Sequence, residues 1–229
     1  MAKLIFHGHA CVELLGGDGT RILIDPFLSE NPLADVGPDA FDRLDYLLLT
    51  HGHFDHVADA WEILGRTDAT LVATFEIVAY AQEKQGVKNA HPLHIGGGWD
   101  FPFGRVKLTS AIHGGQVVGE GAEGFTTCPA GILLSIDGHR VYHAGDTALT
   151  VDMTLLKGQV DTALLPIGDN FTMGPEDAAL AVDMIKPRVV IPIHYDTWPL
   201  IAQDPEGFRA RVEPRAEVVV LLPGESYEF

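Results

Sequence analysis

Six consecutive residues, His51 to His56, include four side chains that can bind a metal ion. They read His-Gly-His-Phe-Asp-His and follow the apolar residues 46–50. Imidazole nitrogens and carboxylate oxygens are the ligands that hold zinc, manganese or iron in catalytic sites. With 11 histidines in 229 residues, chance produces this pattern in roughly two of every thousand chains of this composition. We therefore interpret the run as part of a metal site rather than as a polar loop.

The spacing within the run favours two ions over one. His51 and His53 project from a loop after a predicted strand, whereas Asp55 and His56 occupy the turn that opens a predicted helix at residues 57–61. Neighbouring residues on a helical turn point about 100° apart, so Asp55 and His56 do not easily share an ion with the first two histidines. Six residues cannot complete two coordination spheres, and more ligands must therefore come from elsewhere.

Three further ligand-type side chains stand where an apolar segment ends. They are His113 after residues 106–112, Asp146 after residues 140–143 and His194 after residues 189–193. Sheets in α/β proteins place their sites at the carboxyl ends of strands, so we expect these side chains to join the first motif. His143 lies inside a predicted strand, and we interpret it as a packed core histidine.

This succession of motifs resembles the metallo-β-lactamase superfamily, in which an H-x-H-x-D-H run is followed by a lone histidine, a Gly-Asp-Thr and a late histidine at a strand end. Three further segments resemble the small metal-dependent hydrolases close to the ascorbate-6-phosphate lactonases. They are residues 6–11 (FHGHAC), 166–176 (PIGDNFTMGPE) and 191–199 (IPIHYDTWP). Together the motifs span residues 5–199, nearly the whole chain.

The resemblance implies a metal-binding role for seven side chains, divided between two divalent ions. By ion, they are His51, His53 and His113 for the first, Asp55, His56 and His194 for the second, and Asp146 as the bridge. Zinc is the first expectation for the metal, and manganese and iron are alternatives because this donor set accepts all three.

Two halves of the chain show a similar succession of segments. The corresponding residues are 21–25 and 140–146, 44–49 and 160–165, and 69–73 and 188–192. Such a repeat suggests a duplicated unit. Two β-rich halves packed face to face with helices outside give a four-layer αββα sandwich of the α+β class, which the resemblance also implies. No linker is visible, so we expect residues 1–229 to form a single domain.

Two helices are predicted from their end signals. Residues 174–177 (Gly-Pro-Glu-Asp) place a proline in the first turn and acids near the positive end of the helix dipole, and Pro187 ends the apolar periodicity that follows. Residues 74–86 form the second predicted helix, which Gly86 ends.

The charge of the chain limits its partners. Fifteen Lys and Arg against 32 Asp and Glu give a net charge of −17. Nucleic-acid binding depends on clustered basic residues, and Arg209, Arg211 and Arg215 are interrupted by Glu213. We therefore expect a small-molecule substrate and no nucleic-acid partner. A small anionic substrate stays open, because bound metal ions would dominate the field in the site.

The remaining composition predicts a cytoplasmic protein without membrane contact. No apolar run approaches the 18 or more residues of a membrane span, and residues 1–7 read as a strand rather than a signal peptide. Cys11 and Cys128 are too few for a disulfide framework. The family resemblance alone favours a homo-oligomer.

Four residues outside the ligand set are candidate substrate contacts: His7, His9, Asn170 and Tyr195. His7 and His9 could equally form backbone hydrogen bonds, and polar residues such as the other two are common in surface loops. Asp25, before Pro26, either braces a ligand histidine or caps a turn, since metal-bound imidazoles usually give their other N–H to a carboxylate or carbonyl.

The predicted mechanism follows from the ligands. Water held between two divalent ions ionises near pH 7, and the resulting metal-bound hydroxide attacks a carbonyl or phosphoryl centre. Asp55 would orient this nucleophile and relay a proton to the leaving group. We therefore expect a dinuclear hydrolase of a small ester, lactone or phosphodiester. The alternatives are an iron-dependent redox enzyme of the same fold and a non-catalytic metal-binding protein.

Overall fold

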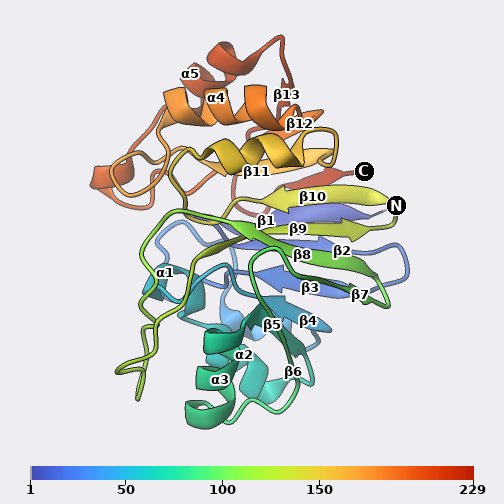
Figure 1. Cartoon of the computed structure of the whole chain (residues 1–229), viewed down its shortest axis with the longest axis vertical. Helices are drawn as coiled ribbons and strands as arrows, with labels where there is room; N and C mark the ends of the chain where they lie inside the picture. Colours follow the sequence, from blue (N-terminus) through green and yellow to red (C-terminus); the bar gives the residue numbers. More distant parts are fainter. Residues whose placement is uncertain (1) are drawn as a thin grey trace.

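Two mixed sheets of seven strands each pack face to face at the centre of the molecule, as the computed structural model of residues 2–229 shows (Figure 1). The first sheet has the order β14 (Ser226–Glu228), β1 (Lys3–Phe6), β2 (Val12–Leu15), β3 (Arg21–Ile24), β4 (Tyr46–Leu48), β5 (Thr70–Thr74) and β6 (Ala90–Leu93). The second has the order β13 (Glu217–Val218), β12 (Val189–Ile193), β11 (Thr162–Pro166), β10 (His139–His143), β9 (Ala130–Ile136), β8 (Gly104–Ser110) and β7 (Gly98–Phe101).

The two sheets repeat one pairing pattern. In the first, β2 and β3 are antiparallel and β3 to β6 are parallel neighbours. In the second, β9 and β10 are antiparallel and β10 to β13 are parallel neighbours. This correspondence confirms the predicted duplication, with the C-terminal strand β14 added to the edge of the first sheet.

Helices cover the outer face of each sheet (Figure 1). The first sheet is covered by α1 (Phe54–Val57), α2 (Ala60–Arg66) and α3 (Phe75–Lys84), and the second by α4 (Pro175–Ile185) and α5 (Pro205–Val212). Short 3₁₀ turns lie at Pro38–Phe41, Val151–Leu156 and Pro199–Ile201. No helix within residues 2–229 is long and apolar enough to cross a membrane.

Three apolar clusters separate four layers. One lies between the sheets and includes Leu14, Leu108 and Ile132. The second joins the first sheet to its helices, and the third joins the second sheet to α4 and α5. In β11 and β12 every residue is buried, as expected for parallel strands covered on both faces. The predicted four-layer αββα sandwich is therefore confirmed.

The helix after the first motif differs from its prediction. It begins earlier, at Phe54, and is interrupted at Ala58–Asp59 before α2 starts. The Asp59 carboxylate accepts hydrogen bonds from the backbone N–H groups of Leu28 (2.7 Å) and Ser29 (3.1 Å). This long-range anchoring explains the interruption. The other two predicted helices are confirmed as α3 and α4.

Candidate metal centre

Six of the strands deliver their following residues to one edge of the sandwich. The strands β1, β3 and β4 run in one direction within the first sheet, and β8, β10 and β12 do so within the second. The ligand-type residues follow these strands directly. They are His9 after β1, Asp25 after β3, His51 to His56 after β4, His113 after β8, Asp146 after β10 and His194 after β12.

Three groups of potential ligands form at this edge, each with its donor atoms within 4.8 Å of one another. The groups are His51, His53 and His113; His9, Asp55, His56 and His194; and His51, His56 and Asp146. The first two bring together the side chains that the sequence analysis assigned to each ion, with His9 added to the second. The third group links them, because it shares a member with each.

Asp146 occupies the position between the two predicted ion sites. Its Oδ2 lies 3.4 Å from His113 Nε2 on one side and 3.1 Å from His194 Nε2 on the other. Its Oδ1 lies 3.3 Å from His56 Nε2. In the first group, His113 Nε2 and His53 Nδ1 approach to 3.2 Å. These distances fit side chains that converge on bound metal.

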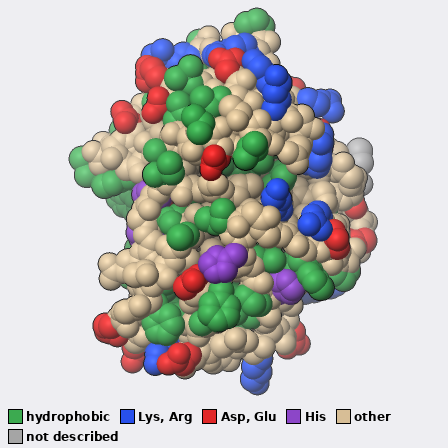
Figure 2. Space-filling model, viewed as in Figure 1, with side chains coloured by type: hydrophobic (Ala, Val, Ile, Leu, Met, Phe, Trp, Pro, Cys, Tyr) green, Lys and Arg blue, Asp and Glu red, His purple; other side chains and the backbone are tan. Residues whose placement is uncertain are grey.

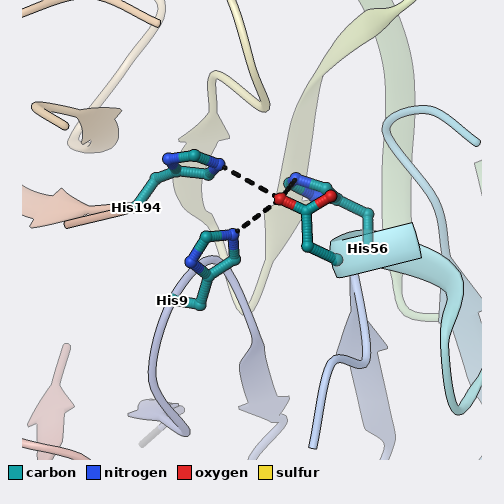
Figure 3. A group of neighbouring side chains, drawn as sticks. His9, His56 and His194 are labelled. Atoms are coloured by element: carbon teal, nitrogen blue, oxygen red, sulfur yellow. Dashed lines mark hydrogen bonds and ion pairs between the residues drawn. The ribbon is translucent and has the colours of Figure 1, made fainter. Parts of the chain in front are cut away.

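His9 belongs to this centre more closely than the sequence predicted. Its Nε2 lies 3.1 Å from Asp55 Oδ2, and its ring centroid is 4.0 Å from that of His194. Figure 3 shows the rings of His9, His56 and His194 pointing toward one another from separate elements of the fold. The predicted substrate contact is thus a neighbour of the Asp55 carboxylate.

Asp25 lies behind two of the imidazoles. It accepts a hydrogen bond from His56 Nδ1 at 2.8 Å and others from the Thr50 N–H and hydroxyl, at 2.8 and 2.6 Å. Thr50 Oγ1 also lies 3.0 Å from His51 Nδ1, and it accepts that N–H because its own proton goes to Asp25. Both imidazoles therefore present Nε2 to the centre. Bracing of a ligand histidine by Asp25 is the alternative that the structure supports.

The inward-facing atoms fit a metal ion. Among residues 2–229, His51 Nε2, His56 Nε2, His194 Nε2 and Asp146 Oδ1 are buried and have no hydrogen-bond partner. Buried polar atoms are normally paired, so a cluster of orphaned donors and acceptors at one point requires an explanation. Imidazole and carboxylate groups directed at one point are the donor set of a divalent metal site.

The charges in the centre support the same conclusion. Burial raises the pKa of the Asp146 carboxyl, but His194 and His56 outweigh it and hold the pKa well below its usual range. Burial opposes the protonation of His194, yet Asp146 raises its pKa to about 9. For His51, burial and the neighbouring His56 lower the pKa. Ionised buried carboxylates among imidazoles form a strong site for cations.

The backbone at the site adopts an unfavourable conformation at three positions. His9, Asp25 and His194 have φ values of +57°, +49° and +56°, in the left-handed region that non-glycine residues rarely enter. Such strain persists where the surrounding structure requires it and gathers at functional sites. Gly114 is also required here, since a Cβ at this residue would lie 2.9 Å from Cε1 of His53.

The other three predicted contacts lie outside the cavity above the metal centre. His7 Nδ1 donates to Asp35 at 2.9 Å, and its Nε2 lies 3.7 Å from Glu13. Tyr195 packs against the apolar cluster under α4 and α5. Asn170 is exposed in the loop after β11. The structure does not bring these three side chains to the ligand cluster.

A cavity of about 300 Å³ opens above the ligands. Its lining consists of His53, Phe54, Asp55, His113, Asp146, Phe171, His194 and Trp198. Three of these residues, Phe54, Phe171 and Trp198, were not among the predicted contacts. Each stands within a motif already recognised, and an aromatic residue in such a motif is the signal that could have found them.

A family model described as the β-lactamase superfamily domain matches residues 20–195 of the chain. Together with the fold and the ligand cluster, this match places the chain in the metallo-β-lactamase superfamily.

Similar proteins narrow the family. A UPF0173 metal-dependent hydrolase of Anoxybacillus flavithermus is 46% identical over 230 residues, which cover 99% of this chain and 100% of that protein. One from Heliobacterium modesticaldum is 47% identical, covering 99% and 97%. The solved structure of Igni18, a metallo hydrolase of Ignicoccus hospitalis, has a TM-score of 0.86 and 36% identity, covering 100% and 99%. The chain therefore belongs to the UPF0173 metal-dependent hydrolase family.

Proposed function

We propose that this metal-dependent hydrolase is dinuclear and acts on a small ester, lactone or phosphodiester. The observation that carries the proposal is the convergence of two ligand groups on Asp146, with the Nε2 atoms of His51, His56 and His194 buried and unpartnered. The roles assigned to the seven ligands from the resemblance agree with this grouping. The closer resemblance to the ascorbate-6-phosphate lactonases stays a prediction.

Individual residues of the chain would have separate roles in hydrolysis. Two divalent ions held by these ligands would supply a water that ionises near pH 7 and an electrophilic centre for the substrate oxygen. Asp55 lines the cavity with its side chain 21% exposed, so it is accessible from the cavity and also lies beside the buried histidines. It would orient the attacking water and pass a proton to the leaving group. His9 holds the Asp55 carboxylate in place from behind.

The proposal also concerns which metal is bound, which class of substrate is used and whether the protein forms an oligomer. Zinc is expected first, and manganese or iron would suit the same donors. A net charge of −17 supports a small-molecule substrate over a nucleic acid. A homo-oligomer remains an expectation that gel filtration tests, because a monomer would elute near 24.8 kDa.

Metal stoichiometry is the experiment that tests this function. The protein is purified without an affinity tag or added metal, and its metal content is measured by mass spectrometry. We expect close to two ions per chain, and their identity separates zinc or manganese hydrolysis from iron redox chemistry. A content near zero with no uptake on titration would overturn the proposal.

A further inference from the structure

The cavity above the metal centre has a polar floor and apolar walls. The floor consists of the ligand side chains, and the walls are the rings of Phe54, Phe171 and Trp198. Phe171 is 52% exposed and Phe54 is 40% exposed. Large apolar side chains that are exposed together beside a concave site are typical of ligand-binding surfaces.

The aromatic wall is held in place by packing. The buried ring of Phe27 contacts Phe54 edge-on at a centroid distance of 5.5 Å and lies 5.9 Å from the ring of Trp198. Trp198 also contacts the ring of His9 at 5.0 Å. Because these rings support one another, the part of the wall formed by Phe54 and Trp198 is a preformed surface that a ligand meets without reordering it.

Apolar exposure continues beyond the lining residues. Ile112 directly precedes the predicted ligand His113 and is 59% exposed, and Leu200 follows Trp198 by two residues and is 67% exposed. Ile112 stands on the loop after β8 and Leu200 in the 3₁₀ turn Pro199–Ile201, both at the same edge of the sandwich. An apolar substituent longer than the cavity therefore has further surface to cover.

Lys and Arg are missing from all the loops that form this edge. The following stretches contain no Lys or Arg: residues 4–20, 22–42, 44–65, 108–139, 141–156, 158–185 and 189–208. The residues that line the cavity, within the part of the chain that the structure describes, accordingly include none. Figure 2 agrees, because Lys and Arg gather mainly over its upper and right-hand parts, whereas the middle of its left margin carries hydrophobic and histidine side chains.

This charge distribution disfavours an anionic group on the substrate. Proteins recognise phosphate and carboxylate groups with Arg or Lys, often through two parallel hydrogen bonds. Here such a group would face aromatic rings and, beyond them, a surface of net charge −17. The metal ions could neutralise the reacting centre itself, but nothing in the walls would compensate a second negative charge.

We infer that the substrate is an uncharged carboxylic ester, open-chain or cyclic, with an apolar aryl or alkyl group that lies against Phe54, Phe171 and Trp198. This inference rests on the proposed hydrolytic function and narrows it, since the cavity walls disfavour substrates that carry a negative charge away from the reacting centre, such as phosphorylated lactones. Water adds to the carbonyl carbon, the bond from that carbon to the alkoxy oxygen breaks, and the alkoxy oxygen takes up a proton. The products are one carboxylic acid and one alcohol, which for a lactone are parts of one molecule.

Matched substrates test the inference on the metal-loaded protein. Each added CH₂ in the series 4-nitrophenyl acetate, butyrate and hexanoate should raise kcat/KM by up to about fourfold, as expected for burial of a methylene group. The 4-nitrophenyl monoester of adipic acid resembles the hexanoate but carries a carboxylate at its far end. It should be turned over at least about tenfold less efficiently than the hexanoate. Equal or better turnover of the adipate ester would overturn the inference.

Variants test whether the aromatic wall of the cavity causes the preference for longer apolar chains. Phe171→Ala should raise KM for the hexanoate about tenfold, so that kcat/KM increases less with chain length. The metal content of this variant should be unchanged. Trp99→Ala is the matched control, because Trp99 is also an exposed aromatic residue but lies on β7 and not in the cavity lining. If kcat/KM rises with chain length as steeply in Phe171→Ala as in the native protein, the aromatic wall does not cause the preference for longer chains.

A binding measurement separates failure of this inference from failure of the proposed function. Titration with hexyl phenyl ketone, followed through the fluorescence of Trp198 and assigned with Trp198→Phe, should show saturable binding. Its analogue with a sulfonate, a weak metal ligand, at the far end of the alkyl chain should bind at least about tenfold more weakly. Absence of turnover for every ester and for bis(4-nitrophenyl) phosphate, with two ions bound, would contradict the hydrolase proposal. Equal or tighter binding of the sulfonate than of the ketone would contradict the apolar site, whatever the turnover.

Discussion

Nε2 of His9 lies 3.1 Å from Oδ2 of Asp55, although 46 residues separate them in the chain. On the other side of the imidazole, Nδ1 lies 2.8 Å from the Thr197 hydroxyl. Burial, together with the nearby His194, lowers the pKa of His9 to about 4, so the ring is neutral at pH 7. Its N–H then donates to the carboxylate from Nε2, and Nδ1 accepts from Thr197.

The substitution His9→Asn should slow hydrolysis because it releases the Asp55 carboxylate. Asn tolerates the left-handed backbone at this position but is too short to reach Asp55. We expect kcat to fall about 10–100-fold, the usual cost of losing a group that orients a metal-site residue. The measurement combines steady-state kinetics with metal analysis. His94→Gln, at an exposed histidine away from the cavity, is the control, and equal kcat values in the two variants would contradict this role.

Asp25→Asn should weaken metal binding and lower stability together. The carboxylate accepts from His56 Nδ1, from the Thr50 N–H and from the Thr50 hydroxyl, and an amide cannot accept all three in the same way. We expect metal affinity to fall about 10–100-fold and the free energy of unfolding to fall by about 1–3 kcal/mol. Competition with a chelator and urea denaturation measure the two effects. Thr50→Ser keeps the hydroxyl and should change neither the metal affinity nor the free energy of unfolding by much. An unaltered metal affinity in Asp25→Asn would show that Asp25 does not orient His56.

Sequence patterns could predict the fold and most of the metal centre, because short stretches of sequence identify the strands, the helix ends and the residues that follow each strand. Residues 189–193 are apolar throughout and are followed by His194, and this pattern identifies a buried strand with a functional end. Pro175 and Pro187 similarly delimit α4. Parallel strands bring such ends together at one edge, so the grouping of His51, Asp146 and His194 needed no knowledge of individual contacts.

Contacts between the two sheets could not be predicted in this way. His9 enters the centre because the loop after β1 touches the loop after β12, where the His194 N–H donates to the His9 carbonyl at 2.6 Å. The interruption of the helix at Asp59 likewise depends on Leu28, 31 residues earlier. Packing of distant loops decides both features, and neither leaves a periodic pattern in the sequence.

Removal of the metal should destabilise the protein. The Nε2 atoms of His51, His56 and His194 would be buried without partners, next to ionised carboxylates. At a metal concentration of 100 times Kd, binding stabilises by about 2.7 kcal/mol, which corresponds to about 5–10 °C in Tm for a chain of this length. Differential scanning calorimetry after dialysis against a chelator measures the loss, and zinc should restore the original Tm. Calcium prefers oxygen ligands and should not restore the original Tm. An identical Tm with and without zinc would argue against the metal centre.

His7 should stabilise the fold more at low pH than at high pH. Burial of His7 opposes its protonation, but hydrogen bonds and charge from Glu13 and Asp35 outweigh this and raise its pKa above 6.5. A group whose pKa is higher in the folded state gives its full stabilisation below the unfolded pKa, and this contribution is lost as pH rises through the folded pKa. The Tm difference between the native protein and His7→Gln should therefore be larger at pH 5.5 than at pH 8.5. Asp35→Asn removes the acceptor 2.9 Å from Nδ1 and should show the same trend. If both differences are independent of pH, His7 is not charged in the folded protein, and its contact with Asp35 is a hydrogen bond of the neutral imidazole.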